Sequence, residues 1–517
     1  MADDITGYNA VEGYAGRLSV RAGDELTLHV RCTTERFDVS IYRWGAERRL
    51  VWSAVDLAGV AHPIPADADA NGCGWPAAVT LAVPEDWPSG FYDVTLRAHG
   101  AAPDRAESHA CFVVRGPVEG RAARALLVIA TNTYHAYNSW GGRSLYTGGH
   151  QVSYRRPFGR GIVVRPIVER DDRKSWPVRW GEEPDIDGDR YQRHRWANGL
   201  PGYMASAGWF TYERRFVEWA ERSGFALDFA VSTDLEHDPS ALDGYSLVLG
   251  VGHDEYWSAA GRDAVEAHVR NGGTYASLSG NTMFWQVRVT ADGDSMVCHK
   301  YSAHVADPVM GTDAEATMSG MWSDHVVGRP EHAFLGARSA SGLYSRFGKA
   351  TPRASGAFTV YRSDHWLLEG TGLRYGDQLG ARDGVVGYET VGCPITFDEV
   401  QLPVPMPGRG TPPDAEIIAF APSSNLAMGE YPKSIAALDD QGDLEFIAER
   451  VYGGRDEVAL AKARHGNSVM MVSQPYGPSA GEVITIGSTD WVFGLEHDPA
   501  VGAVTANVMR RGLAPRG

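Results

Sequence analysis

The sequence lacks several features that would place the protein in particular classes. None of its apolar runs approaches the ~18 residues of a membrane-spanning helix, so we expect no membrane span. Residues 1–6 contain neither the basic nor the apolar region of a signal peptide, and we therefore expect a cytoplasmic protein. The 65 acidic residues outnumber the 48 basic ones, which gives a net charge of −17. This balance argues against a nucleic-acid partner, because phosphate binding needs clustered Lys and Arg.

Cysteine is also scarce, with five residues in 517. Their number is odd and none forms a Cys-x-x-Cys pair, which argues against a zinc site built on cysteine. Cys32 and Cys111 could face each other across a β-sandwich. Because a cytoplasmic protein keeps its thiols reduced, the sequence favours free, buried cysteines over a disulfide.

Residues 1–116 are predicted to form an all-β domain. Short runs rich in β-branched residues alternate with turns of Gly, Pro and Asp, and predict strands at 17–20, 25–32, 38–44, 78–83, 92–98 and 110–114. This spacing predicts an immunoglobulin-like β-sandwich. Titratable groups do not cluster here as they would in an active site, so a packing or oligomerisation module is expected, with a glycan-binding surface as the alternative.

Residues 117–517 are predicted to form an α/β domain with large insertions. Strands are expected at 125–130, 228–232, 358–362, 384–388, 417–421, 469–472 and 483–486, and helices at 212–223 and 499–511. A loop dense in Tyr, Asn and Trp is expected at 131–142. The stretch 143–200 shows no long periodicity, and structureless segments of such length within a domain are usually functional. Residues 290–350 are predicted to be a large insertion, because they are rich in Gly, His and polar residues.

The centre of this domain is a strand–helix–strand unit. A buried strand over 246–251 leads through Gly252 to His253, Asp254 and Glu255, and a helix is expected over 259–270. A second buried strand, 274–278, ends in Ser279-Gly280-Asn281. Open parallel sheets bind ligands beyond the carboxyl ends of their strands. Residues two apart in an extended segment point the same way, so His253 and Glu255 are expected to face one site while Asp254 faces away.

The residue types near these strand ends favour metal chemistry over nucleophilic catalysis by serine or cysteine. The Gly-x-Ser-x-Gly spacing of a serine nucleophile is absent around Ser279, and no cysteine lies in that turn, so a serine or cysteine hydrolase is the weaker reading. Tyr134, Tyr137, Tyr154 and Glu255 are hard oxygen donors. Two phenolates and one carboxylate would balance a trivalent ion such as ferric iron, although a tyrosine in an aromatic loop is usually structural.

Five segments occur in an order that resembles the large (beta) subunit family of N,N-dimethylformamidase. They are 132–138, 152–154, 252–257, 280–282 and 386–389. The resemblance covers about 120–510 and implies a glutamine-amidotransferase-like, flavodoxin-like α/β domain without its cysteine. It further implies hydrolysis of the C–N bond of a small amide at a mononuclear Fe(III) centre.

The resemblance also assigns residues. It implies that Tyr137, Tyr154 and Glu255 bind the iron, with Tyr134 a rival of Tyr137. It matches His253, Asn281 and Glu389 to the family's catalytic and supporting positions.

The sequence lacks an extra N-terminal region that the family's best-known member has. Its loops at 143–200 and 290–345 also differ from that member. These differences put dimethylformamide itself in doubt as the substrate. We expect a homo-oligomer, and a small partner subunit is a further option. The alternative hypothesis is a non-catalytic or carbohydrate-binding protein that has kept the fold.

Overall fold

The computed structural model describes residues 8–117, 119–165, 173, 194–344, 349–350, 354–425 and 440–514. Part of the predicted irregular stretch 143–200 therefore lies outside the described residues. The chain divides into two compact units. Unit 1 comprises 1–172, 191–244 and 288–298, and unit 2 comprises 173–190, 245–287 and 299–517.

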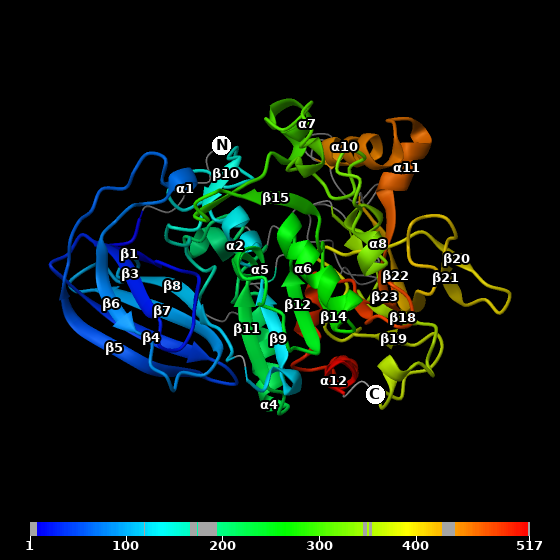
Figure 1. The fold of residues 1–517 in the computed structure, drawn as a ribbon, viewed down its shortest axis with the longest axis horizontal. Coiled ribbons are helices and arrows are strands. Elements are labelled where there is room, and N and C mark those ends of the chain that lie inside the picture. The colour runs from blue at the N-terminus through cyan, green and yellow to red at the C-terminus, as the bar shows by residue number, and fades with distance from the viewer. Residues whose placement is uncertain are drawn as a thin grey trace. The chain divides into compact units, whose positions relative to one another are not determined.

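Unit 1 begins with two β-sheets, drawn in blue in Figure 1. One sheet has the order β1-β3-β6 and the other β2-β8-β7-β4-β5. Their bounds are β1 Val11–Ala15, β2 Ser19–Val20, β3 Glu25–Cys32, β4 Arg36–Trp44, β5 Arg48–Ala58, β6 Ala77–Ala82, β7 Gly90–Ala98 and β8 Glu107–Val114. The short helix α1 (Ala68–Asn71) lies between β5 and β6.

The core between these sheets follows from alternation along the strands. In β4, Phe37, Val39 and Ile41 are buried, while the residues between them are more exposed. They share one apolar cluster with Leu28 of β3 and Val94 of β7. The predicted strands of this region are therefore confirmed. The prediction missed β1, which carries Glu12 and Gly13, and β5, which is largely exposed.

The rest of unit 1 contains a parallel strand pair. β9 (Ala125–Ile129) pairs in parallel with β11 (Leu227–Val231), as expected for the start of an α/β domain. α4 (Glu213–Arg222) and α5 (Ser232–His237) flank β11 in the chain, and β10 (Gln151–Ser153) pairs antiparallel with β16 (Ser295–Val297).

The prediction of a loop at 131–142 is wrong over its first half, because Thr131–Tyr137 forms helix α2. Its β-branched, Asn and aromatic residues have low helix propensity. All seven of its residues are buried, so packing rather than propensity stabilises this helix.

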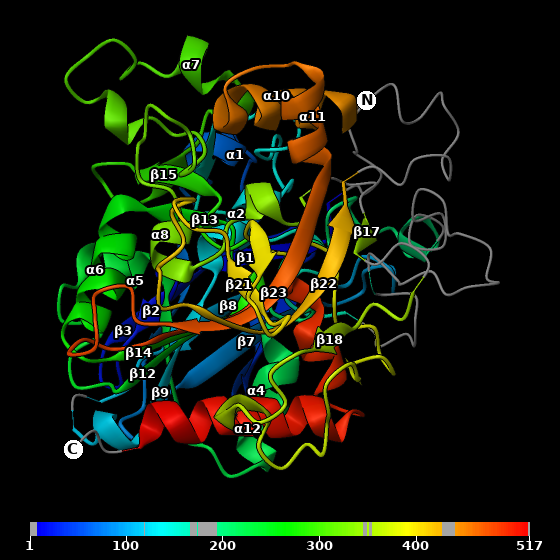
Figure 2. The same cartoon turned by 90° about the vertical axis from the view of Figure 1, so that its right-hand side faces the viewer.

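Unit 2 is built on a mixed sheet of order β12-β14-β24-β23-β22-β18-β19. β12 (Leu247–His253), β14 (Thr274–Gly280) and β24 (Val483–Ile486) are parallel, and the following pairs are antiparallel. The remaining strands are β23 His465–Ser473, β22 Glu416–Ser424, β18 Phe358–Val360 and β19 Gln378–Leu379, with β17 (Lys349–Ala350) paired to β22. Figure 2 shows β22 and β23 side by side.

Helix α6 (Ala259–Arg270) connects the two central strands and has the predicted bounds. Its N-cap Ser258 accepts a hydrogen bond from the Gly261 backbone N–H. Asn271 and Gly272, the latter at φ +95°, end the helix. Helix α12 (Pro499–Leu513), drawn in red in Figure 2, packs on β12 and β14.

Unit 2 also corrects the predictions. No strand forms over 384–388, because Gly387 donates its N–H to Ser488 Oγ rather than to a neighbouring strand. The described part of the insertion, 290–344, contains only short elements: β16, η3 Lys300–Ser302, α7 Ala303–Ala306, η4 Glu315–Thr317, α8 His332–Leu335 and η5 Ser339–Ser341. The prediction missed α10 (Asp440–Tyr452) and α11 (Glu457–Arg464).

The remaining elements are β13 Tyr256–Ser258, parallel to β15 Trp285–Val289; the hairpin of β20 Ile395–Phe397 and β21 Pro403–Pro405; and the 3₁₀ helices η1 Arg121–Ala123, η6 Trp366–Leu368 and η7 Thr489–Gly494. All five cysteines are buried and free, as predicted. Among the described residues, no helix has the length and apolar character needed to cross a membrane.

Candidate metal centre

Strand β12 carries two of the candidate residues to the sheet edge. His253 is its last residue, and Glu255 follows two positions later, so both side chains point to the same side. His253 Nε2 lies 3.4 Å from Glu255 Oε2, and both side chains are buried. Asp254 faces elsewhere and accepts a hydrogen bond from the Trp257 indole N–H at 3.0 Å. Burial raises the pKa of Asp254 to about 7. The prediction that His253 and Glu255 face one site while Asp254 faces away is therefore confirmed.

Strand β14 carries the third residue, Asn281, just past its carboxyl end. Asn281 has φ +50°, a left-handed conformation that asparagine tolerates better than most residues. Its side-chain N–H donates to Glu389 Oε2 at 2.7 Å, and the same nitrogen lies 3.4 Å from His253 Nε2. Gly280 precedes it, and a Cβ there would lie 2.1 Å from the Glu389 carbonyl oxygen. Glycine at this position therefore permits the close approach of the segment that carries Glu389.

Glu389 completes the cluster from the segment between β19 and β20, where it lies in neither helix nor strand. Its Oε2 is 2.7 Å from His253 Nε2 and its side chain is 8% exposed. Four of the six predicted site residues, His253, Glu255, Asn281 and Glu389, are thus brought together although they are spread over more than a hundred positions of the sequence.

This arrangement can hold a metal ion. His253, Glu255 and Glu389 each offer one donor atom, and these atoms lie within 4.8 Å of one another. Imidazole and carboxylate are common ligands of transition metals. Two buried carboxylates need a compensating charge, and a cation between them would supply it. The residues present therefore fit a metal ion, and their donor chemistry alone does not select which one.

Sequence reasoning missed three neighbours of this cluster. Trp285 donates its indole N–H to Glu255 Oε1 at 2.8 Å. Lys300 is only 4% exposed, has φ +51°, and its Nζ lies 5.2 Å from the Trp285 ring centre. Tyr301 stacks edge-on against Trp285 at 5.3 Å. No motif marks these residues, and the only signal is that they follow the second central strand.

Comparison with known proteins gives matches along most of the chain. A family model described as "N,N-dimethylformamidase beta subunit-like, C-terminal" matches residues 37–503. The chain belongs to this family.

Relatives in the family agree. An N,N-dimethylformamidase beta subunit from Alcaligenes sp is 27% identical over 468 residues, covering 85% of this chain and 54% of the relative. One from Paracoccus aminophilus is 24% identical over 466 residues, covering 84% and 54%. The chain thus spans about half the length of these relatives.

The tyrosines that the dimethylformamidase resemblance assigns to the metal are in unit 1. Tyr137, on α2, is buried, and its hydroxyl accepts a hydrogen bond from Tyr146 at 2.7 Å. Tyr154 donates its hydroxyl hydrogen to Asn132 Oδ1 at 2.8 Å, and burial raises its pKa. Tyr134 lies one helical turn before Tyr137 and is also buried. Such phenols stay protonated at neutral pH unless a strongly charged cation binds them.

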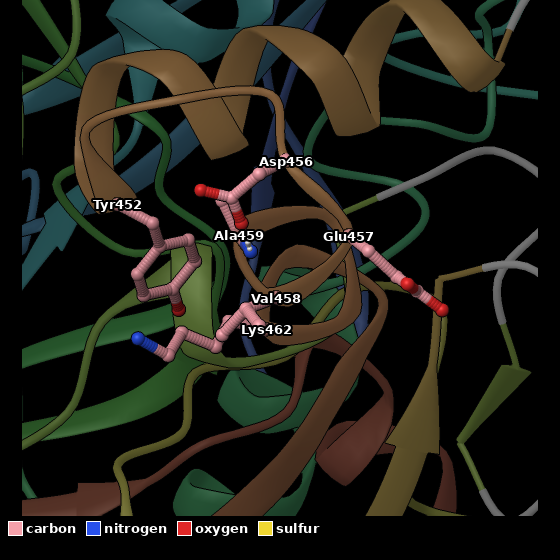
Figure 3. A pocket seen from close by; sticks show the side chains of 6 residues that line it. All are labelled: Tyr452, Asp456, Glu457, Val458, Ala459 and Lys462. Atoms are coloured by element: carbon pink, nitrogen blue, oxygen red, sulfur yellow. Dashed lines mark hydrogen bonds between the residues drawn. The ribbon is translucent and has the colours of Figure 1, made fainter.

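A surface pocket in unit 2 has a different character from the cluster around His253. It has a volume of about 290 Å³ and is lined by residues of α10, α11 and their connection, namely Tyr452, Asp456, Glu457, Val458, Ala459 and Lys462 (Figure 3). Asp456 is engaged as the N-cap of α11, since its Oδ1 accepts from the Ala459 N–H. None of the predicted site residues lines this pocket.

Proposed function

We propose that this chain is a metal-dependent amidohydrolase that cleaves the C–N bond of a small amide. The observation that carries the proposal is the buried convergence of His253, Glu255 and Glu389 with Asn281 at the ends of β12 and β14. Buried ionisable groups at the ends of parallel strands favour a functional role. The relatives are named for N,N-dimethylformamidase, which supports an amide as the substrate class.

The proposed metal is a single ferric ion with Tyr137, Tyr154 and Glu255 as its ligands, and with Tyr134 as the rival of Tyr137. Two phenolates and one carboxylate match its three positive charges. A bound cation of this kind supplies Lewis-acid chemistry, polarising the amide carbonyl or lowering the pKa of a water. Glu255 belongs both to this set and to the His253–Glu255–Glu389 group, so it is the residue on which metal binding depends most.

Glu389 is the proposed proton carrier. Its carboxylate takes the proton of the attacking water and passes it to the departing amine nitrogen. His253 and Asn281 contact Glu389 Oε2 at 2.7 Å each, so they fix its orientation. The same two side chains also hydrogen-bond the attacking water or the oxyanion that develops on the amide oxygen. Removal of one such donor is expected to cost on the order of 10²–10³ in rate.

We also propose a domain architecture and an oligomeric state for the chain. Residues 1–116 form an immunoglobulin-like module, and 117–517 a glutamine-amidotransferase-like domain that lacks the cysteine nucleophile. The chain assembles with copies of itself. A small partner subunit is a further option, and the relatives' name, beta subunit, supports the presence of a partner. Light scattering of the purified protein measures the self-assembly.

Metal analysis with visible spectroscopy tests the proposal, followed by a screen of small amides for amine release. We expect near-stoichiometric iron and a broad tyrosinate-to-iron band. Glu255→Ala should lose the metal, and an active, metal-replete Glu255→Ala protein would refute the proposal. Glu389→Gln should keep metal and lose turnover. If Glu389→Gln also loses metal, the ligand set is His253, Glu255 and Glu389 instead, and the tyrosines are not ligands.

A further inference from the structure

Glu389 lies in a segment without regular secondary structure, yet a proton carrier must be held to within a fraction of an ångström. Its carboxylate is oriented by His253 and Asn281, but those contacts leave its backbone to be fixed by other groups. The backbone is held by the three residues Ser488, Thr489 and Asp490, which follow β24 and which we call the 488–490 clamp.

Thr489 engages Glu389 through both of its polar groups. The Glu389 N–H donates to Thr489 Oγ1 at 3.2 Å, and the Thr489 N–H donates to the Glu389 carbonyl oxygen at 3.1 Å. The Thr489 hydroxyl hydrogen is donated in turn to the Gly387 carbonyl oxygen at 2.7 Å. Thr489 has no solvent exposure, so water does not substitute for these bonds.

The neighbours of Glu389 are held by the same clamp. Gly387 donates its N–H to Ser488 Oγ at 3.1 Å, and its carbonyl oxygen accepts the Asp490 N–H at 3.0 Å. Asp490 is fixed by a buried ion pair of 2.8 Å with Arg173. A displacement of Thr489 would therefore be transmitted to Glu389 and to Gly387.

We infer that Thr489 is a positioning residue for the Glu389 carboxylate, through the hydroxyl that bridges the Glu389 N–H and the Gly387 carbonyl oxygen. The role of Glu389 in this inference rests on the proposed function. The chemistry requires a hydroxyl, because the same oxygen must accept one hydrogen bond and donate another. Serine meets this requirement, and valine, which has the same shape as threonine, does not.

The test compares Thr489→Val with Thr489→Ser in the full-length, metal-containing protein. Thr485→Val is the matched control. Thr485 is equally buried and lies in β24, but its hydroxyl donates to the Leu335 carbonyl oxygen and does not touch the segment at 385–390. Two quantities are measured: kcat and KM for a small amide, and backbone hydrogen exchange of a peptide that covers 385–391.

We expect Thr489→Val to lower kcat by about 10- to 100-fold, the scale of a displacement of up to 1 Å, with KM within about threefold of the wild type. Exchange at 385–391 should become faster only in this variant. Thr489→Ser and Thr485→Val should keep kcat within about threefold.

Three results would overturn the inference: wild-type kcat and exchange in Thr489→Val, an equal loss of kcat in Thr489→Ser, or an equal loss in Thr485→Val. If the wild-type protein hydrolyses no amide, the proposed function fails. The exchange measurement then decides by itself whether the Thr489 hydroxyl holds the segment.

Discussion

Replacement of Gly280 by alanine should separate metal binding from turnover. The added Cβ would lie 2.1 Å from the Glu389 carbonyl oxygen and 2.6 Å from the Thr489 nitrogen, where real Cβ atoms keep at least 3.0 Å. Both obstacles are backbone atoms, so no side chain can rotate away. The segment that carries Glu389 must therefore retreat by roughly 1 Å to relieve the closer contact.

A retreat of that size sets the expected magnitude. A misplacement of 1 Å in a catalytic group costs on the order of 10²-fold in rate, and overpacking of a dense interior costs about 1–3 kcal/mol of stability. Glu255 follows the other strand, β12, and a Cβ on Gly280 meets the Glu389 and Thr489 backbones rather than Glu255. Metal content should therefore stay near that of the wild type while kcat/KM for the amide falls about a hundredfold.

The assay combines iron content, thermal unfolding and kcat/KM on one amide. Gly454→Ala is the control, because its Cβ would meet only Asp456 Oδ2, at an ordinary distance of 3.7 Å. A Gly280→Ala protein with kcat/KM close to wild type and an unchanged melting temperature would refute the reasoning. Loss of metal together with activity would instead mean that the Glu389 segment takes part in binding the ion.

Three further predictions concern single side chains. Trp285→Phe removes the indole N–H from Glu255 and should weaken metal binding about 10- to 100-fold in a chelator competition; unchanged affinity would show that this bond does not orient the ligand. Burial raises the pKa of Glu12 from 4.5 to about 7, so its protonated form favours folding below pH 4.5 and this contribution is lost as pH rises through 7. In the wild type, the free energy of unfolding measured in urea should therefore fall by about 3 kcal/mol over this pH range because of Glu12, and Glu12→Gln should lack this fall. If the unfolding free energy of Glu12→Gln depended on pH as in the wild type, the prediction would be contradicted. Ser258→Ala removes the N-cap of α6 and should lower stability by about 1 kcal/mol, whereas Ser258→Asp should retain it, as measured by thermal unfolding.

Much of the fold was predictable because it depends on local signals. The bounds of α6 follow from Ser258 at its start and Gly272 at its end, and β12 follows from the apolar run that begins at Leu247. The common direction of His253 and Glu255 follows from the period of an extended chain. These features require no knowledge of what lies across the sheet.

Other parts were not predictable, because distant residues determine them. The segment 384–388 has the composition of a strand, but Ser488 bonds its backbone instead, from about a hundred positions away. Helix α2 forms in a sequence of low helix propensity because it is fully buried. Lys300 carries no motif, and its burial against Trp285 is visible only in three dimensions. The pairing of Glu389 with Asn281 was suggested by family resemblance rather than by spacing.

The order in which the central strands and the 488–490 clamp are synthesised bears on how the protein folds. During synthesis, His253, Glu255 and Asn281 leave the ribosome long before residues 488–490. Strand β24, which pairs with β14, emerges equally late. A nascent chain therefore carries an open sheet edge at β14 until β24 has been synthesised. A fragment that ends before β24 should be insoluble or depend on a chaperone, and the proposed activity should require residues 488–490.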